Sequence, residues 1–244
     1  LKSKKNVAHH YDIGEDLYDL FLDKKHRQYS CAYFKSANNT LEEAQQNKIN
    51  HIIKKLDLRP GQKVLDIGAG WGSMCFEIAK QSQCEVTGVT LSENQYQYCK
   101  KKSKELKLDN QCNFELLDYR ELKGKFHRVV SVGMLEHVGR KFYKTFFNKV
   151  KELMTDDGIA LIHTIGSVLP KGPPQPFIQK YIFPGGLVPS GSDLIDAIEK
   201  SDLILSDMES FIHHYDKTLK AWLDRFSENR NKAKKMYSEN FCRM

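Results

Sequence analysis

The sequence lacks several patterns that would assign it to common protein classes. No two of its six cysteines are separated by two residues, so the sequence indicates neither a zinc knuckle nor a disulfide framework. No apolar run approaches the ~20 residues that a membrane-spanning helix needs. Signatures of RNA- or DNA-binding domains and internal repeats are also missing. These absences favour a globular protein of a reducing compartment, which we expect to be the cytoplasm.

The size and charge of the chain set further bounds. Its 244 residues can bury a substantial core as one domain, or as one domain with a cap. The formal net charge is +7, and lysines cluster at Lys2–Lys5, Lys100–Lys104 and Lys232–Lys235. Such clusters are usually solvated helix faces, but they also suit an anionic surface, for which we favour membrane phospholipid over nucleic acid. Because the chain begins at Leu1 and ends without a helix stop signal, we expect a fragment.

The stretch Lys63–Gly72 organises the rest of the chain. A short apolar run, Val64–Ile67, is followed by glycines at every second position and then by a helix-like segment from Ser73, which indicates a strand, a tight turn and a helix. The G-x-G-x-G spacing differs from the G-x-G-x-x-G of dinucleotide-binding proteins, and no Lys-Ser/Thr pair follows as in a P-loop. Asp66, directly before the first glycine, suits a cationic ligand better than a pyrophosphate. The alternative is an ordinary turn whose glycines serve packing.

Strand-like and helix-like segments alternate after this turn, which predicts a parallel sheet with helices on both faces. The predicted strands are 63–67, 85–89, 112–117, 127–132, 158–164 and 204–211, and the predicted helices are 72–81, 93–107, 140–154, 191–200 and 215–238. An amphipathic helix from Leu41 to Leu58, capped by Thr40, precedes them. Residues 166–190 hold most of the prolines, so we expect a lid or substrate loop there.

Polar groups follow five of the predicted strands, where ligands of open α/β sheets bind. The first strand is followed by Gly68, Gly70 and Gly72, the second by Thr90, Ser92, Asn94 and Gln95, the third by Asp118 and Arg120, and the fourth by Glu136 and His137, while His163 and Thr164 lie within or after the fifth. Thr90, Ser92 and Asn94 could also cap the next helix. Glu136 and His163 could form an ion pair, a metal site or an acid–base couple. With Cys31 as the one further candidate ligand they lack the paired spacing of metal sites, so we predict no metal.

Five motifs, in order along the chain, carry a resemblance to a known family. They are Tyr29–Phe34, Gly68–Gly72, Gly133–Gly139, His163–Gly166 and Tyr181–Gly186, and His10-Tyr11-Asp12 and His214-Tyr215 match as well. The chain resembles the cyclopropane-fatty-acyl-phospholipid synthases and the mycolic acid cyclopropane synthases. This implies the Rossmann-like α/β fold of class I S-adenosylmethionine (SAM) methyltransferases, with a mainly parallel seven-stranded sheet, helices on both faces and a helical or loop lid.

The family resemblance also implies an activity and a set of site residues. Family members transfer the methyl group of SAM to a cis double bond of a phospholipid acyl chain, and a bound bicarbonate removes a proton so that a cyclopropane ring closes. The bicarbonate pocket matches Cys31, Glu136, His163, the backbone of Ile165, and Tyr215. The implied SAM contacts are Tyr29, Ser30, Gly68, Ala69, Gly70, Trp71, Gly72, Thr90, Leu91, Ser92, Gln95, Tyr119 and Arg120. Thr90 stands where many methyltransferases place an acid for the ribose, so that contact would come from Gln95.

The resemblance implies one catalytic domain, with a helical cover at 1–58, a SAM-binding core at 59–166, the lid at 167–190 and a C-terminal part at 191–244. Membrane phospholipid would be reached by peripheral contact, and a homodimer is the expected assembly, with no nucleic-acid partner. The rival within the methyltransferases makes a methyl-branched lipid or methylates an amine. The rivals outside them are a non-catalytic SAM- or lipid-binding module, which would lack pocket groups, and an NAD-dependent oxidoreductase, which would need G-x-G-x-x-G.

Overall fold

The computed structural model describes residues 15–167, 176–177 and 187–243. These residues fall into two compact units, one formed by residues 52–208 and the other by residues 15–51 together with 209–243, and we describe each by itself. The motif at 181–186, the His10-Tyr11-Asp12 match, and most of the predicted lid lie outside the described residues. The predicted division of the chain into cover, core, lid and C-terminal part stays a prediction.

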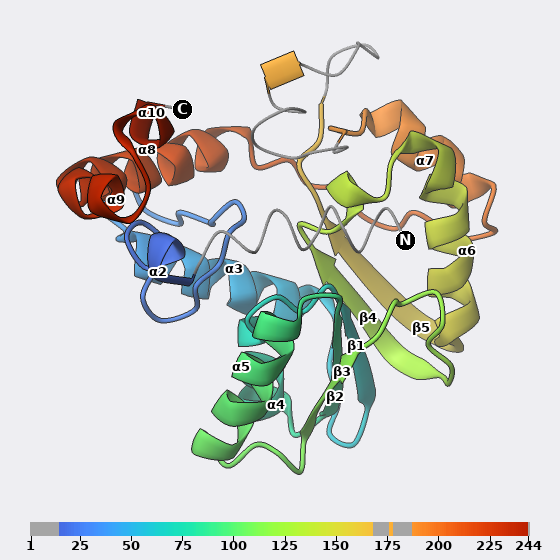
Figure 1. The fold of residues 1–244 in the computed structure, drawn as a ribbon. Helices are drawn as coiled ribbons and strands as arrows, with labels where there is room; N and C mark the ends of the chain where they lie inside the picture. Colours follow the sequence, from blue (N-terminus) through green and yellow to red (C-terminus); the bar gives the residue numbers. More distant parts are fainter. Residues whose placement is uncertain (1–14, 168–175, 178–186, 244) are drawn as a thin grey trace. The chain divides into compact units, whose positions relative to one another are not determined.

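The first unit is built on a parallel sheet (Figure 1). Its strands are β1 (Lys63–Ile67), β2 (Glu85–Thr90), β3 (Cys112–Leu116), β4 (Phe126–Val132) and β5 (Met154–His163), in the order β3-β2-β1-β4-β5. Leu65 pairs with Thr87 on one side and with Val129 on the other. The sequence predicted all five strands, and they place the five polar strand ends at one edge of the sheet, because the strands run in the same direction.

Helices cover both faces of this sheet, as predicted (Figure 1). Helices α4 (Ser73–Ser82) and α5 (Glu93–Glu105) pack against β2 and β3, whereas α6 (Tyr143–Leu153) packs against β5, with α7 (Gly191–Glu199) beside it. Short 3-10 turns, η1 (Leu135–His137) and η2 (Arg140–Phe142), lead into α6. Strand side chains alternate between the faces.

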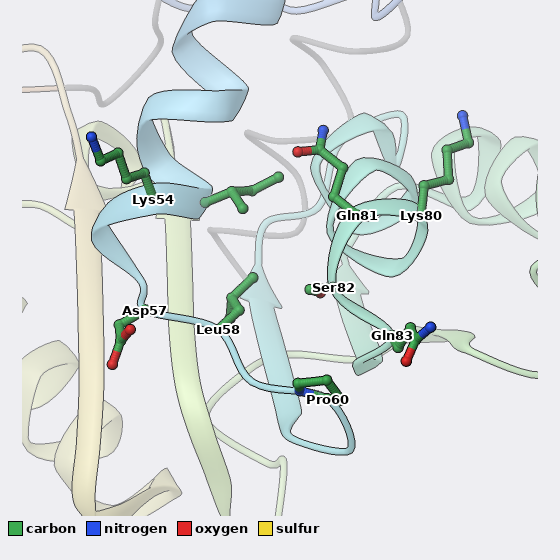
Figure 2. Close-up of a pocket in the computed structure, with 9 residues that line it drawn as sticks. Lys54, Asp57, Leu58, Pro60, Lys80, Gln81, Ser82 and Gln83 are labelled. Atoms are coloured by element: carbon green, nitrogen blue, oxygen red, sulfur yellow. The ribbon is translucent and has the colours of Figure 1, made fainter.

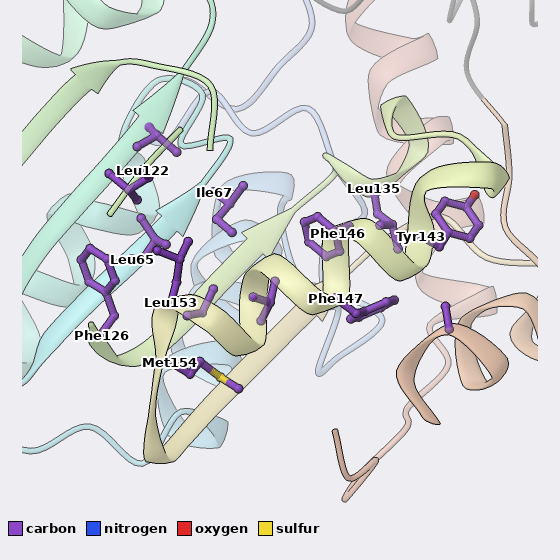
Figure 3. Close-up of a cluster of buried hydrophobic side chains, with 14 residues drawn as sticks. Leu65, Ile67, Leu122, Phe126, Leu135, Tyr143, Phe146, Phe147, Leu153 and Met154 are labelled. Carbon is purple, nitrogen blue, oxygen red and sulfur yellow. The ribbon is translucent and has the colours of Figure 1, made fainter. Parts of the chain in front are cut away.

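The apolar core of the first unit lies between the sheet and α6 (Figure 3). Leu65 and Ile67 of β1 contribute one side of this cluster, and Tyr143, Phe146 and Val150 of α6 contribute the other. The α6 residues recur at spacings of three and four, which puts them on one helix face. The core therefore fixes β1, and with it the start of the glycine turn.

The prediction of a seven-stranded sheet was wrong for the part of the chain that the structure describes, where the sheet has five strands. The segment predicted as a strand at 204–211 has no regular structure, and Ile204 is 93% exposed. Alternation of apolar residues indicates a strand only where a neighbouring strand offers a hydrogen-bonding edge. No described strand pairs with this segment.

The second unit is helical. It contains α2 (Glu15–Tyr18), α8 (Ile212–Glu228), α9 (Arg230–Met236), α10 (Glu239–Arg243) and the part of α3 (Leu41–Lys55) up to residue 51. The predicted cap of α3 is confirmed: the Thr40 Oγ1 accepts from the Glu43 N–H at 3.2 Å, and the Thr40 N–H donates to Glu43 Oε2 at 2.8 Å. No described helix has the length and apolar character needed to cross a bilayer.

The single helix predicted at 215–238 is instead two helices that meet at Asn229. The Asn229 side-chain Nδ2 donates to the carbonyl oxygens of Leu20 and Arg225, both at 3.0 Å. An asparagine that bonds nearby backbone groups competes with the regular helical pattern, which explains the break. Arg225 forms a two-pronged ion pair with Glu42 of α3, with N–O distances of 2.9 and 2.6 Å, and this pair ties α8 to α3.

Candidate functional site

The glycine turn follows β1, and Gly70 and Gly72 in it have different surroundings. All three have positive φ, at 81° for Gly68, 55° for Gly70 and 77° for Gly72. A Cβ on Gly72 would lie 2.9 Å from the Cys99 Sγ, so this glycine serves packing. A Cβ on Gly70 would meet nothing within 4 Å, so the backbone here borders open space. Packing explains Gly72, and the open space at Gly70 is compatible with the approach of a ligand, which stays a prediction.

Ala69 and Trp71, which alternate with these glycines, are buried. The Ala69 N–H joins that of Gly68 in donating to the Val89 carbonyl at 3.0 Å. The Trp71 ring meets Tyr98 edge-on at 5.3 Å between centroids. Their side chains therefore support the turn from inside.

Asp66 lies beneath the turn and not at its surface. Its side chain is buried, the Cys75 thiol donates to Oδ2 at 3.4 Å, and burial raises the pKa of the carboxyl to about 7. The expectation that Asp66 itself faces a cationic ligand is therefore not met. Its position on β1 explains why: Asp66 points to the face covered by α4, opposite to Leu65 and Ile67.

The residues after β2 form a connected polar group. The Thr90 hydroxyl donates to Gln95 Oε1 at 2.8 Å, and Thr90 Oγ1 accepts from the Ser92 N–H at 3.2 Å. Ser92 is the N-cap of α5, with its Oγ accepting from the Gln95 N–H, so the capping role considered from the sequence is confirmed. Leu91 lies half-exposed between these residues. The Gln95 amide nitrogen remains the group that could reach a ribose hydroxyl.

The residues after β3 are tied to each other. The Arg120 guanidinium binds Asp118 through Nε at 2.9 Å and Nη2 at 2.6 Å, and this pairing holds the pKa of the Asp118 carboxyl below its usual range. Tyr119 packs edge-on against Phe146 at 5.6 Å. Arg120 is therefore paired with Asp118, and the SAM contacts predicted for Tyr119 and Arg120 stay predictions.

Glu136 and Ile165 meet at the carboxyl ends of β4 and β5. Glu136 is buried, and its Oε1 accepts the Ile165 N–H at 2.7 Å. Burial raises the pKa of this carboxyl, and hydrogen bonding from the Ile165 N–H and from the neighbouring Thr164 hydroxyl works against that effect. Glu136 Oε2 is also buried and has no hydrogen-bond partner among the described residues. The Ile165 N–H thus has Glu136 as its hydrogen-bond partner, and its predicted contact with bicarbonate stays a prediction. His163 ends β5, half-buried, opposite Val132 of β4.

The remaining predicted site residues belong to the second unit. Tyr29 lies against Trp222 with ring centroids 5.1 Å apart, and Tyr215 of α8 packs half-buried on the same apolar cluster. Cys31 is buried, and burial raises the pKa of its thiol to about 11, with Lys48 and the Thr218 hydroxyl acting in the opposite direction. The group therefore stays a neutral S–H donor near neutral pH.

Lys48 of α3 is a residue that the sequence reasoning missed. It is fully buried, and its Nζ donates to the Ser30 Oγ at 2.6 Å. The signal was present in the spacing Leu41, Ala44, Lys48, which puts the lysine on the buried face of the helix. The structure thus joins Ser30, Cys31 and Lys48 in one unit, and the glycine turn, the β2 and β3 ends and Glu136–Ile165 in the other.

A pocket elsewhere in the first unit is not part of this site (Figure 2). It is lined by residues that include Pro60, which precedes β1, and Ser82 and Gln83, which precede β2. These positions lie at the amino ends of the strands, opposite to the edge where parallel sheets bind ligands.

Several known proteins are similar to this chain. The family model described as mycolic acid cyclopropane synthetase matches residues 1–244, the whole chain. The chain belongs to this family. The cyclopropane-fatty-acyl-phospholipid synthase of Escherichia coli K12 is 42% identical over all of this chain, and a probable fatty acid methyltransferase of Pseudomonas putida is 36% identical over 98% of it. The chain spans 63% and 62% of these two relatives.

A solved family member shows the same fold. The mycolic acid cyclopropane synthase CmaA1, in a structure complexed with SAH and CTAB, superposes with a TM-score of 0.92 at 32% identity and covers 98% of this chain and 88% of its own. This chain therefore has the fold of class I SAM-dependent methyltransferases, as predicted.

Proposed function

We propose that this chain catalyses SAM-dependent cyclopropanation of a cis double bond in a phospholipid acyl chain. The observation that carries the proposal is the match of the whole chain to the cyclopropane synthetase family. The Escherichia coli relative is a cyclopropane-fatty-acyl-phospholipid synthase, and the solved structure of CmaA1 is complexed with SAH. SAM supplies an activated methyl group on a sulfonium, which a weakly nucleophilic alkene requires.

The residues of the glycine turn fit this cofactor. Gly70 borders open space, so its backbone leaves room for a ligand at the carboxyl end of β1. The Thr90–Gln95 pair offers neutral groups for a ribose, and the Tyr119 ring offers a face for an adenine. We also propose Tyr29 and Ser30 as SAM contacts, on the strength of the family motif Tyr29–Phe34.

Each group assigned to bicarbonate has, by itself, the hydrogen-bonding chemistry that a small protonated anion needs. Glu136 Oε2 is a buried acceptor without a described partner, which suits the O–H of bicarbonate, because buried acceptors are normally satisfied. Cys31 stays a thiol that can donate, and Tyr215 and His163 can donate as well. Ile165 holds Glu136 in place through its N–H. In this proposal Glu136 accepts the bicarbonate proton and orients the base that deprotonates the new methyl group.

The test uses Glu136→Gln, with vesicles that contain a cis-monounsaturated phospholipid as substrate. We expect turnover to fall at least ~100-fold, the usual contribution of a positioned acid–base group, while the Kd for SAM stays within threefold. Glu77→Gln is the matched control, because Glu77 is also a buried carboxylate of the first unit but lies on α4 beside Lys80. Bicarbonate-free buffer should abolish the turnover of the wild type, and added bicarbonate should restore it. Full activity of Glu136→Gln would refute the assignment of this base.

A second candidate, methyl branching of a lipid, is favoured by the similarity to the probable fatty acid methyltransferase. Both products gain one CH₂, but the cyclopropane loses the double bond and a methyl-branched alkene keeps it. Catalytic deuteration followed by mass spectrometry counts the remaining double bonds and separates the two reactions.

We further propose that the protein acts in the cytoplasm by peripheral contact with membranes and as a homodimer. The lysines at 100, 101 and 104 of α5 are exposed, as an anionic surface would require. Co-sedimentation with anionic vesicles, compared with neutral vesicles, tests the contact. Sedimentation velocity tests the assembly.

A further inference from the structure

A fully buried lysine in the second unit has no role in the mechanism described so far. Lys48 lies on α3, and Ser30 Oγ, 2.6 Å from its Nζ, is its one hydrogen-bond partner among the described residues. Taking an ammonium out of water costs several kcal/mol, which a single neutral acceptor, apolar packing and the charge of Asp23 repay only in part. Leucine or methionine would serve the core better at this position, so the charge has another use.

The segment that Lys48 contacts is held from several sides. The Gln28 N–H donates to Asp23 Oδ1 at 2.9 Å, the Ser30 carbonyl accepts from Gln45 Nε2 at 3.0 Å, and the Ala32 N–H donates to the Thr218 hydroxyl at 3.0 Å. The backbone of residues 28–32 is therefore fixed without Lys48. What Lys48 adds is a contact with the Ser30 hydroxyl alone.

That contact determines which way the Ser30 hydroxyl can donate. An ammonium has three donors and no acceptor, so Ser30 Oγ must accept from Lys48, and the serine proton points elsewhere. A neutral amine has a lone pair, so the serine proton can then turn inward to Lys48 and is lost to any ligand. Protonated Lys48 thus leaves Ser30 only outward donation, whereas neutral Lys48 also permits the inward direction.

The surroundings of Lys48 place this change of protonation near neutral pH. Burial lowers its pKa to about 7, while the negative charge of Asp23, from the segment after α2, and Cys31, from the segment after Ser30, act to raise it. Cys31 is itself a neutral thiol in this range, because its own pKa is raised to about 11. Asp23 is the anion that keeps Lys48 partly charged.

We propose that Lys48 is a positioning residue that directs the Ser30 hydroxyl outward as a donor to an acceptor oxygen of SAM. This inference rests on the proposed function, in which Ser30 contacts SAM. It makes SAM binding depend on the charge of a residue that never touches the ligand.

The experiment measures SAM binding by calorimetry from pH 6 to pH 8. If only the protonated form is competent, the Kd of the wild type should rise about tenfold over this range, because the competent fraction falls from about nine-tenths to about one-tenth. The α-amino group of SAM titrates in the same window, so the profile is compared with that of Ser30→Ala, which retains that contribution. Lys48→Met and the double variant Ser30→Ala/Lys48→Met complete a double-mutant cycle with the wild type and Ser30→Ala. The matched control is Lys54→Met, because Lys54 is an exposed lysine of the same helix.

We expect the tenfold rise in Kd between pH 6 and pH 8, beyond the part caused by the α-amino group of SAM, to vanish in Ser30→Ala, Lys48→Met and the double variant. The same rise should persist in Lys54→Met. If Lys48→Met does not fold, Ser30→Ala decides alone, because it removes a half-buried hydroxyl and leaves Lys48 in place. Wild type and Ser30→Ala with the same pH profile would overturn the inference and leave the proposed function standing. A wild type that binds no SAM at any pH would refute both.

Discussion

Asp66 offers a stability prediction that can be worked from the structure. The carboxyl is buried under the glycine turn with the Cys75 thiol as its one hydrogen-bonding side chain among the described residues, and its pKa is raised to about 7 against an ordinary value of 3.8. Asp66→Asn keeps the size of the side chain and removes its charge. The amide nitrogen of asparagine would lack an acceptor, at a cost of about 1–3 kcal/mol that does not change with pH.

The pH dependence has a definite sign. Below pH 3.8 the folded and unfolded states both hold the Asp66 proton. Between pH 3.8 and about 7 the folded state keeps the proton while the unfolded state releases it, so the free energy of unfolding falls as pH rises, and the loss is complete above about 7. From pH 5 to pH 8 this loss amounts to about 3 kcal/mol, at 1.36 kcal/mol per pKa unit. The stability of Asp66→Asn relative to the wild type should therefore rise by about 3 kcal/mol over that interval.

Urea unfolding at pH 5 and pH 8 measures this difference. The two tryptophans, Trp71 and Trp222, lie in different units, so a Trp222→Phe background makes fluorescence report the unit that contains Asp66. Asp118→Asn is the control, because its pKa is lowered by Arg120 and both states are ionised throughout this range. A relative stability of Asp66→Asn that changes by less than about 1 kcal/mol between the two pH values would refute the reasoning.

Substitutions at Gly70 and Gly72 separate packing from ligand binding, and substitutions at Thr218 test the support of the Cys31 segment. Gly72→Ala should lower the free energy of unfolding in urea by about 2–4 kcal/mol, because the added Cβ would meet the Cys99 Sγ at a residue with positive φ. Gly70→Ala should lower it by about 1 kcal/mol and should weaken SAM binding measured by calorimetry. Equal losses of stability in the two variants would contradict this. Thr218→Val should destabilise the protein by about 1–3 kcal/mol, because the buried Ala32 N–H loses its acceptor, and Thr218→Ser should restore most of the loss.

Local sequence patterns predicted most of the first unit, for a physical reason. An apolar run that ends in G-x-G-x-G leaves few alternatives to strand, turn and helix, and β1 has the predicted bounds. The segment at 204–211 shows the limit of such patterns, because pairing depends on a neighbour that lies far away in the sequence. Asn229 shows another limit: the helix breaks there through a bond to Leu20, which helical periodicity does not reveal.

The sequence named residues of the candidate site but not the hydrogen bonds between them. Glu136 and Ile165 were both named from the sequence, yet the sequence could not indicate that one would bind the other. Lys48 was missed because a lysine in a helix is normally read as solvent-facing. Its place on the apolar side of α3 was the available clue.

Asp66 and Lys48 are two ionisable groups that burial moves to the same pKa of about 7 from opposite sides. For both, burial disfavours the charged form, so near neutral pH each holds a charge for only part of the time. A core selected for stability alone would replace both by apolar residues of similar size. One lies under the glycine turn and the other under Ser30, so the polarity is retained beneath the two segments proposed to contact SAM. Because breaks of local rules tend to mark functional sites, the place of these two groups beneath the proposed SAM contacts favours a role in binding.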